Sequence, residues 1–138
     1  MQRLVRVGAL IMLVLGLTGL AFGIVLLVSA NSVHNGTVEE LEIDHSPTTI
    51  GELRDLREDL STTRRAFFNA FGPAAYNPAD PAQQTGYNLL IMEKGVGLSL
   101  TNLSRAMMYQ YAGIGMLALG VGLATAGVVQ YRMAGRMT

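Results

Sequence analysis

Two long apolar stretches near the ends of the chain dominate its hydrophobic pattern. Residues 7–30 form a run of 24 residues and residues 112–129 a run of 18, and neither run contains a charged residue. As helices they would extend about 36 and 27 Å, close to the roughly 30 Å hydrocarbon core of a bilayer. Tyr111 and Tyr131 frame the second run with the spacing of interfacial aromatic residues. We therefore predict transmembrane helices over residues 7–30 and 109–131.

The segment between these runs has the pattern of a helical hairpin. Residues 31–47 read as irregular or as a short strand, because Leu41 and Ile43 alternate with acidic residues. Thr49 followed by Glu52 is a capping box, which predicts a helix A over residues 49–71. Its predicted core face, in steps of three and four, consists of Leu53, Leu56, Leu60, Thr63, Phe67 and Ala70.

A proline-rich linker over residues 72–84 separates helix A from a helix B that starts at about residue 85. The apolar positions of helix B are Leu89, Met92, Val96, Leu100, Leu103 and Met107. Helix B can continue into the second span because residues 88–131 contain no proline, and Gly95 and Gly97 are the positions where it would bend. Helices A and B should pair as an αα-hairpin.

The distribution of charge predicts an orientation. The tails, residues 1–6 and 132–138, carry four arginines and no acid, whereas the segment between the spans carries all ten acids and six bases. The positive-inside rule then places both termini in the cytoplasm and residues 31–108 outside. The predicted fold class is an all-α integral membrane protein with two antiparallel transmembrane helices and an extracytoplasmic αα-hairpin, located in the cell membrane.

One alternative is that residues 1–30 are a signal peptide cleaved after Val28-Ser29-Ala30. The first apolar run is longer than the roughly 7–15 residues usual for the apolar region of a signal peptide, so we favour a retained anchor.

Small residues recur in both predicted spans. One set repeats every seventh residue, with Gly19 added, and predicts close packing of the two spans on each other; its members are Ala9, Gly16, Gly19, Gly23, Gly113, Gly120 and Gly127. A second set lies nearly opposite on the second span; its members are Gly115, Ala118, Gly122 and Ala126. Glycine is common in membrane helices, but the second set also suits a partner helix from another subunit or copy.

Composition excludes several kinds of chemistry. The chain has no cysteine, which removes disulfides, thiolate metal sites and cysteine nucleophiles. Ten basic and ten acidic residues balance, so nothing points to nucleic acid. Neither apolar run contains an ionisable residue, so we expect no proton or ion path within this chain. We expect no cofactor and no enzymatic activity, since no catalytic arrangement of residues is recognisable.

Three weaker candidate sites lie between the spans. His34, His45, Glu42 and Asp44 carry metal-ligand chemistry, although their spacing matches no calcium loop and a solvated acidic stretch is the simpler interpretation. Asn35 and Asn102 begin glycosylation acceptor patterns, and Asn35, expected in a loop, is the better acceptor. Phe67, Phe68 and Phe71 form either the apolar cap of the hairpin or a docking patch.

Two functional hypotheses remain. The first is a small non-catalytic accessory or scaffold subunit of a larger membrane protein assembly, with other membrane subunits or copies of itself as partners. The second is an extracytoplasmic binding or sensing module that signals through partner helices, with its ligand between helices A and B or on the acidic stretch.

Overall fold

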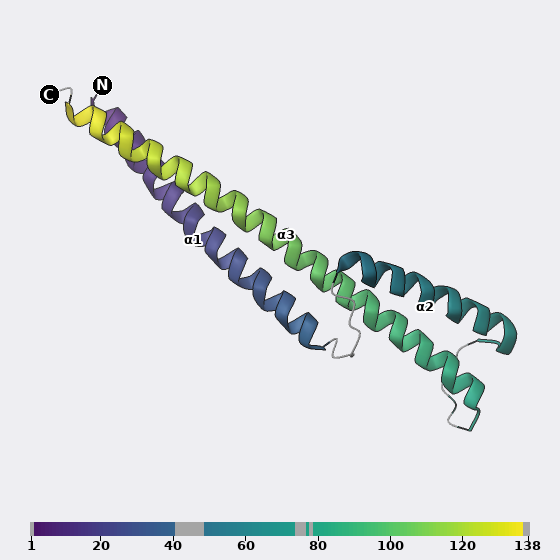
Figure 1. The fold of residues 1–138 in the computed structure, drawn as a ribbon. Helices are drawn as coiled ribbons and strands as arrows, with labels where there is room; N and C mark the ends of the chain where they lie inside the picture. The colour runs from purple at the N-terminus through teal and green to yellow at the C-terminus, as the bar shows by residue number, and fades with distance from the viewer. Residues whose placement is uncertain (1, 41–48, 74–76, 78, 137–138) are drawn as a thin grey trace. The chain divides into compact units, whose positions relative to one another are not determined.

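The computed structural model describes residues 2–40, 49–73, 77 and 79–136. Within these ranges the chain forms three α-helices and no strand: α1 (Gln2–Glu40), α2 (Ile50–Phe71) and α3 (Pro81–Arg136) (Figure 1). Two of them, α1 and α3, are long and apolar enough to cross a membrane. The prediction of an all-helical chain with two candidate spans is confirmed at this level.

Helix α1 is longer than the predicted span. It continues ten residues past Ala30 to Glu40, so the prediction of irregular or strand structure was wrong for residues 31–40. Thr37, seven residues after the buried Ala30, is itself buried and donates its hydroxyl hydrogen bond to the Val33 carbonyl at 2.8 Å. Residues 41–48, with the rest of the predicted strand, lie outside the described residues.

Helix α2 begins as its capping box predicts. The Glu52 amide donates to the Thr49 hydroxyl at 3.2 Å, and the Thr49 amide donates to the Glu52 carboxylate at 3.0 Å. The helix ends after Phe71, where Gly72 adopts a φ of 86° and its amide donates to the Phe68 carbonyl at 2.8 Å. Only glycine takes that backbone conformation without strain, which explains why α2 stops there.

Helix α3 is a single helix of 56 residues, with no interruption at Gly95 or Gly97. The continuity of helix B with the second apolar run is therefore confirmed. The helix starts at Pro81, four residues before the predicted start, because the Asp80 carboxylate accepts from the Ala82 amide at 3.0 Å and the Gln83 amide at 3.4 Å. Aspartate at the cap followed by proline in the first helical position is a strong start signal.

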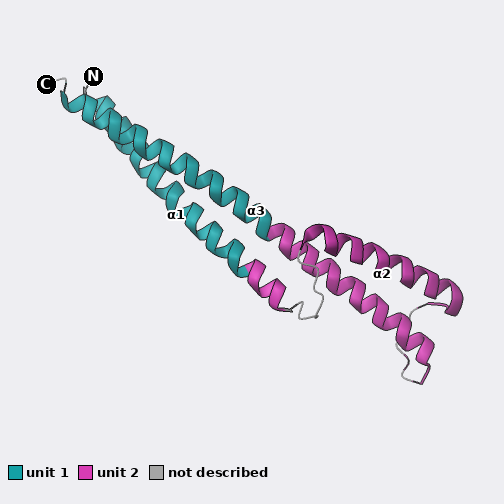
Figure 2. Cartoon of the chain, in the orientation of Figure 1, with its two compact units in different colours: residues 1–32, 106–138 teal, residues 33–105 magenta. Residues whose placement is uncertain are grey.

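Two compact units divide the chain, and Figure 2 colours them separately. Unit 1 contains residues 1–32 and 106–138, which are most of α1 and the C-terminal half of α3. Unit 2 contains residues 33–105, which include α2 and the N-terminal half of α3.

Unit 1 is a close pair of antiparallel helices, with α1 lying alongside α3 in Figure 1. Only 17% of the residues in the most apolar window of each helix are buried, whereas the core helix of a soluble protein would be mostly buried. Large apolar side chains such as Phe22, Val28 and Leu119 are more than half exposed. The outer surface of this pair is therefore apolar nearly all round, as in a helix that contacts lipid.

Unit 2 has a small core between α2 and α3. Leu53, Val96 and Leu103 are buried, and the partly buried residues around them are Ile50, Leu56, Leu60 and Leu100. Met92 and Met107, which the sequence placed on this face, are 54% and 41% exposed. Glu93, not Met92, lies on the α2 side, where it forms an ion pair with Arg64.

Candidate functional site

The small-residue set predicted to pack the two spans lies where α1 and α3 meet in unit 1. Gly16 faces the backbone of Gly120 and Ala124, and Gly23 faces Gly113 and Leu117. A methyl group on Gly16 would lie 2.5 Å from the Ala124 nitrogen and 2.8 Å from the Gly120 carbonyl oxygen. The two backbones therefore approach so closely that any side chain at this position would collide with main-chain atoms.

The contact continues along the pair. A methyl group on Gly127 would lie 2.8 Å from the Ala9 carbonyl oxygen, and one on Gly19 would lie 3.4 Å from the Gly120 Cα. The structure thus brings all seven residues of the first small-residue set into one seam. Ala106 and Ala134, which continue the same seven-residue repeat on α3, are buried as well.

The second small-residue set lies on a different, open face of α3. Gly115, Ala118, Gly122 and Ala126 are all exposed, and no atom lies within 4 Å of a methyl group placed on Gly115 or Gly122. We call this set the open face of α3. Because the side chains on this face are small or absent, a neighbouring helix could approach the backbone of α3 closely there.

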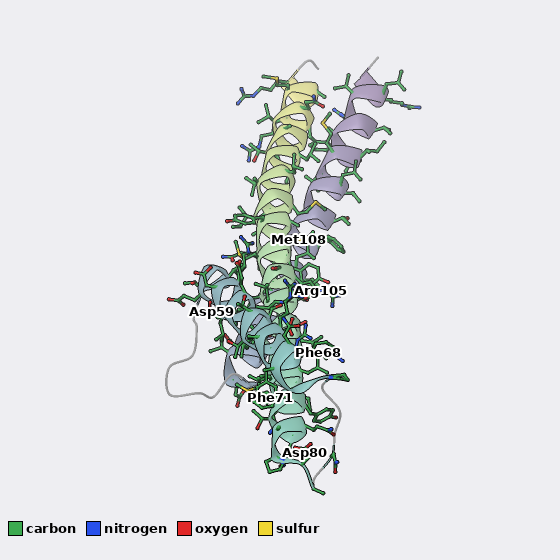
Figure 3. The ribbon with its side chains drawn as sticks, turned by 90° about the vertical axis from the view of Figure 1, so that its right-hand side faces the viewer. Asp59, Phe68, Phe71, Asp80, Arg105 and Met108 are labelled. Atoms are coloured by element: carbon green, nitrogen blue, oxygen red, sulfur yellow. The ribbon has the colours of Figure 1, made fainter. Side chains whose placement is uncertain are left out.

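The phenylalanine cluster is only partly buried. Phe67 and Phe71 pack with ring centroids 4.7 Å apart, while Phe68 and Phe71 are 45% and 60% exposed. In Figure 3 both labelled rings, Phe68 and Phe71, come from the end of α2. The cluster therefore presents apolar surface outward at the end of α2.

The candidate metal ligands are not brought together within the described residues. His34 is exposed on α1, and His45, Glu42 and Asp44 lie outside the described residues. No group of three or more potential ligands occurs in the part of the chain that the structure describes.

Both glycosylation acceptor patterns fall in helices. Asn35 is exposed on α1 and Asn102 is half-buried on α3. The expectation that Asn35 lies in a loop was wrong, because α1 extends through it to Glu40.

A groove runs between α2 and α3 in unit 2, where the binding-module hypothesis places its ligand, although the sequence did not indicate which residues line it. Its volume is about 600 Å³, and its walls carry three cationic side chains and one carboxylate: Arg57, Arg64, Lys94 and Glu93. The Glu93 carboxylate pairs with Arg64, and both side chains are partly buried. Within the described residues, neither Arg57 nor Lys94 has a carboxylate at ion-pair distance. The groove therefore has a formal charge of +2.

Gly97 lies against one of these cations, the Arg57 side chain. A methyl group on Gly97 would lie 3.5 Å from Nε and 3.6 Å from Cζ of Arg57. The Arg57 guanidinium thus lies against the backbone of α3 at Gly97, a position that has no side chain. A larger residue at this position would fill the base of the groove.

Comparison with protein-family models, characterised proteins and solved structures gives no match to this chain. The features of the structure that bear on function are the seam, the open face of α3 and the groove.

Proposed function

We propose that this chain is a small non-catalytic accessory or scaffold subunit of a larger membrane protein assembly. The open face of α3 carries the proposal: four small residues in register leave the backbone accessible on the side away from the α1 seam. Apolar side chains gain little by leaving lipid for one another, so helices in a membrane associate where small residues allow close contact. The partner would be a transmembrane helix of another subunit or of a second copy.

The proposed location is the cell membrane, with two spans and both termini in the cytoplasm. Two features support it: the largely exposed apolar surface of unit 1, and the four tail arginines with no acid beside them. Basic residues flanking a span favour the cytoplasmic side, where anionic lipids also attract them. Residues 31–108, with α2 and the first part of α3, would then lie outside.

Replacing Gly122 with leucine should weaken the assembly without disturbing the fold of the chain. The new side chain meets no atom of its own chain within 4 Å of its Cβ, but it would hold a partner helix away from α3. We expect association to weaken by roughly tenfold or more, which is about 1.4 kcal/mol. The measurement is the mass and composition of the complex purified from membranes in mild detergent.

The matched control is Gly8→Leu on α1, which adds the same side chain at a glycine that also has open space around it. It should leave the complex intact. A complex of unchanged mass and composition in the Gly122→Leu variant would show that the open face of α3 is not an interface.

A second candidate function is an extracytoplasmic binding module, favoured by the groove in unit 2. Its volume of about 600 Å³ lies within the range of roughly 300–1,000 Å³ that is usual for small-molecule sites. Ligand binding there would stabilise α2 against α3, because both helices supply its walls. Thermal unfolding with and without added ligand tests this function, since a ligand that binds only the folded state raises its stability.

A further inference from the structure

The groove in unit 2 combines a cavity with an excess of positive charge. Arg57 and Arg64 are seven residues apart and so lie on the same flank of α2, while Lys94 reaches the groove from α3. Asp55 and Asp59 are two residues from Arg57 on either side, about 200° around the helix, and so lie on another face. Neither is among the groove residues. Helix α2 thus turns its basic flank toward the groove.

Two of the three cations in the groove have no ion-pair partner in the described part of the chain and are therefore available to bind an anion. Arg64 is held by Glu93, a partly buried pair that fixes the wall of the groove. Arg57 and Lys94 have no such partner within the described residues, and the Arg57 guanidinium lies beside Gly97, where α3 has no side chain. Two uncompensated positive charges on facing helices repel each other, so an anion between them would relieve that repulsion.

We propose that this groove binds a phosphoryl group that belongs to an organic phosphate. A phosphate monoester carries about −1.5 to −2 charges at neutral pH, which matches the +2 of the groove better than a single carboxylate does. The Arg57 guanidinium offers paired donors for two phosphate oxygens, and Lys94 adds a point charge. Leu90 and Leu98 line the same groove and offer apolar surface to the organic part of the ligand.

This inference rests on the second proposed function, because it names the ligand class of the binding module. The shared chemistry is the phosphoryl group, which could come from a soluble phosphate or from a lipid headgroup. The test therefore uses two probes, inorganic phosphate and short-chain phosphatidic acid. Each is titrated against the full chain in a non-ionic detergent at constant ionic strength, which keeps the general screening of charge fixed.

We expect saturable binding of at least one probe, with a rise in unfolding temperature. Arg57→Gln should weaken that binding by about tenfold, in line with the loss of one charge-assisted hydrogen-bonding partner. Arg54→Gln is the matched control, since Arg54 is exposed, lies one turn from Arg57 and is not among the groove residues. Gly97→Leu should also abolish binding, by filling the groove without changing its charge.

The outcomes separate the alternatives. Binding of inorganic phosphate alone supports the proposal with a soluble source, and binding of phosphatidic acid alone supports it with a lipid source. Binding of neither probe overturns it, as does an equal loss of binding in the Arg54→Gln control. A third outcome is that neither phosphate probe binds, but a dicarboxylate such as succinate raises the unfolding temperature in a saturable way that Arg57→Gln abolishes. In that case the phosphoryl assignment fails while the binding-module function survives.

Discussion

Replacing Gly16 with alanine will destabilise the pairing of α1 and α3 in unit 1 by about 3 kcal/mol, at the upper end of the usual range for added bulk in a packed core. The added methyl group would lie 2.5 Å from the Ala124 nitrogen and 2.8 Å from the Gly120 oxygen. These are backbone atoms, so no change of side-chain rotamer can make room. The helices must move apart, and the close contacts along the seam would loosen with them.

The matched control is Gly122→Ala on the open face of α3, where the new methyl group meets nothing within 4 Å. Alanine is the better helix former by about 1 kcal/mol in water, so the intrinsic effect of both changes is stabilising or neutral. We therefore expect Gly16→Ala to weaken the pairing of α1 and α3, and Gly122→Ala to leave it unchanged or slightly strengthened. A donor–acceptor dye pair on cysteines introduced at Leu4 and Met133, both exposed in unit 1, reports separation of the helices during titration with a denaturing detergent. If the two variants were equally stable, the close backbone contact at Gly16 would not be what holds α1 and α3 together.

Truncating Leu53 to alanine will destabilise unit 2 by about 2–5 kcal/mol, the range for a large side chain removed from a core. Leu53 is fully buried, and it packs with Val96 and Leu103 in a core of few residues. A small core has little else to hold α2 on α3, so the loss should release α2 as a unit. The measurement is hydrogen exchange of the α2 amides, which should speed up throughout the helix.

Leu98→Ala provides the comparison, because the Leu98 side chain is 67% exposed on α3. Its expected effect is within about 0.5 kcal/mol. If α2 exchanged as slowly in the Leu53→Ala protein as in the Leu98→Ala protein, the core around Leu53 would not be what holds the hairpin together.

The features that sequence predicts well here are those with a local cause. The capping box of α2 needs only Thr49 and Glu52, three residues apart, and its end needs only the glycine at position 72. The seam is a repeat of small residues every seven positions, so it too is visible in the sequence. The continuity of α3 follows from the absence of proline across residues 88–131.

Two errors came from giving a weak pattern priority over a stronger one. The short alternation around Leu41 suggested a strand, yet the seven-residue repeat of Ala9, Gly16, Gly23 and Ala30 continues to Thr37, which is buried on the extended α1. Likewise, Asp80 followed by Pro81 is a helix start, but the prolines of residues 72–84 indicate a linker that would include Pro81. Both signals were present in the sequence.

The residues that line the groove could not be predicted from sequence because they depend on tertiary neighbours. In the sequence, Arg57, Arg64 and Lys94 have the pattern of solvated helix faces, and the apolar spacing of helix B places Met92, not Glu93, on its inner face. Only the register of α2 against α3 shows that Glu93 meets Arg64 and that Arg57 meets Gly97. Periodicity gives the face of each helix but not the alignment of one helix along the other.

The central claim is that the chain is a two-span membrane protein with both ends in the cytoplasm. The most direct test of this claim is the accessibility of introduced cysteines in intact cells. The chain has no cysteine of its own, so single cysteines at Asn35, Ala79 and Thr138 can be labelled with a membrane-impermeant thiol reagent without background. Asn35 and Ala79 are exposed in the structure. Labelling of Thr138→Cys after permeabilisation serves as the control that this cysteine can react.

We predict labelling of Asn35→Cys and Ala79→Cys in intact cells, and labelling of Thr138→Cys only after permeabilisation. The physical reason is the four tail arginines, which favour retention of both ends on the cytoplasmic side. Labelling of Thr138→Cys with protection of Ala79→Cys would invert the proposed topology. Labelling of all three in intact cells would contradict the two-span account and support a single span or a cleaved leader.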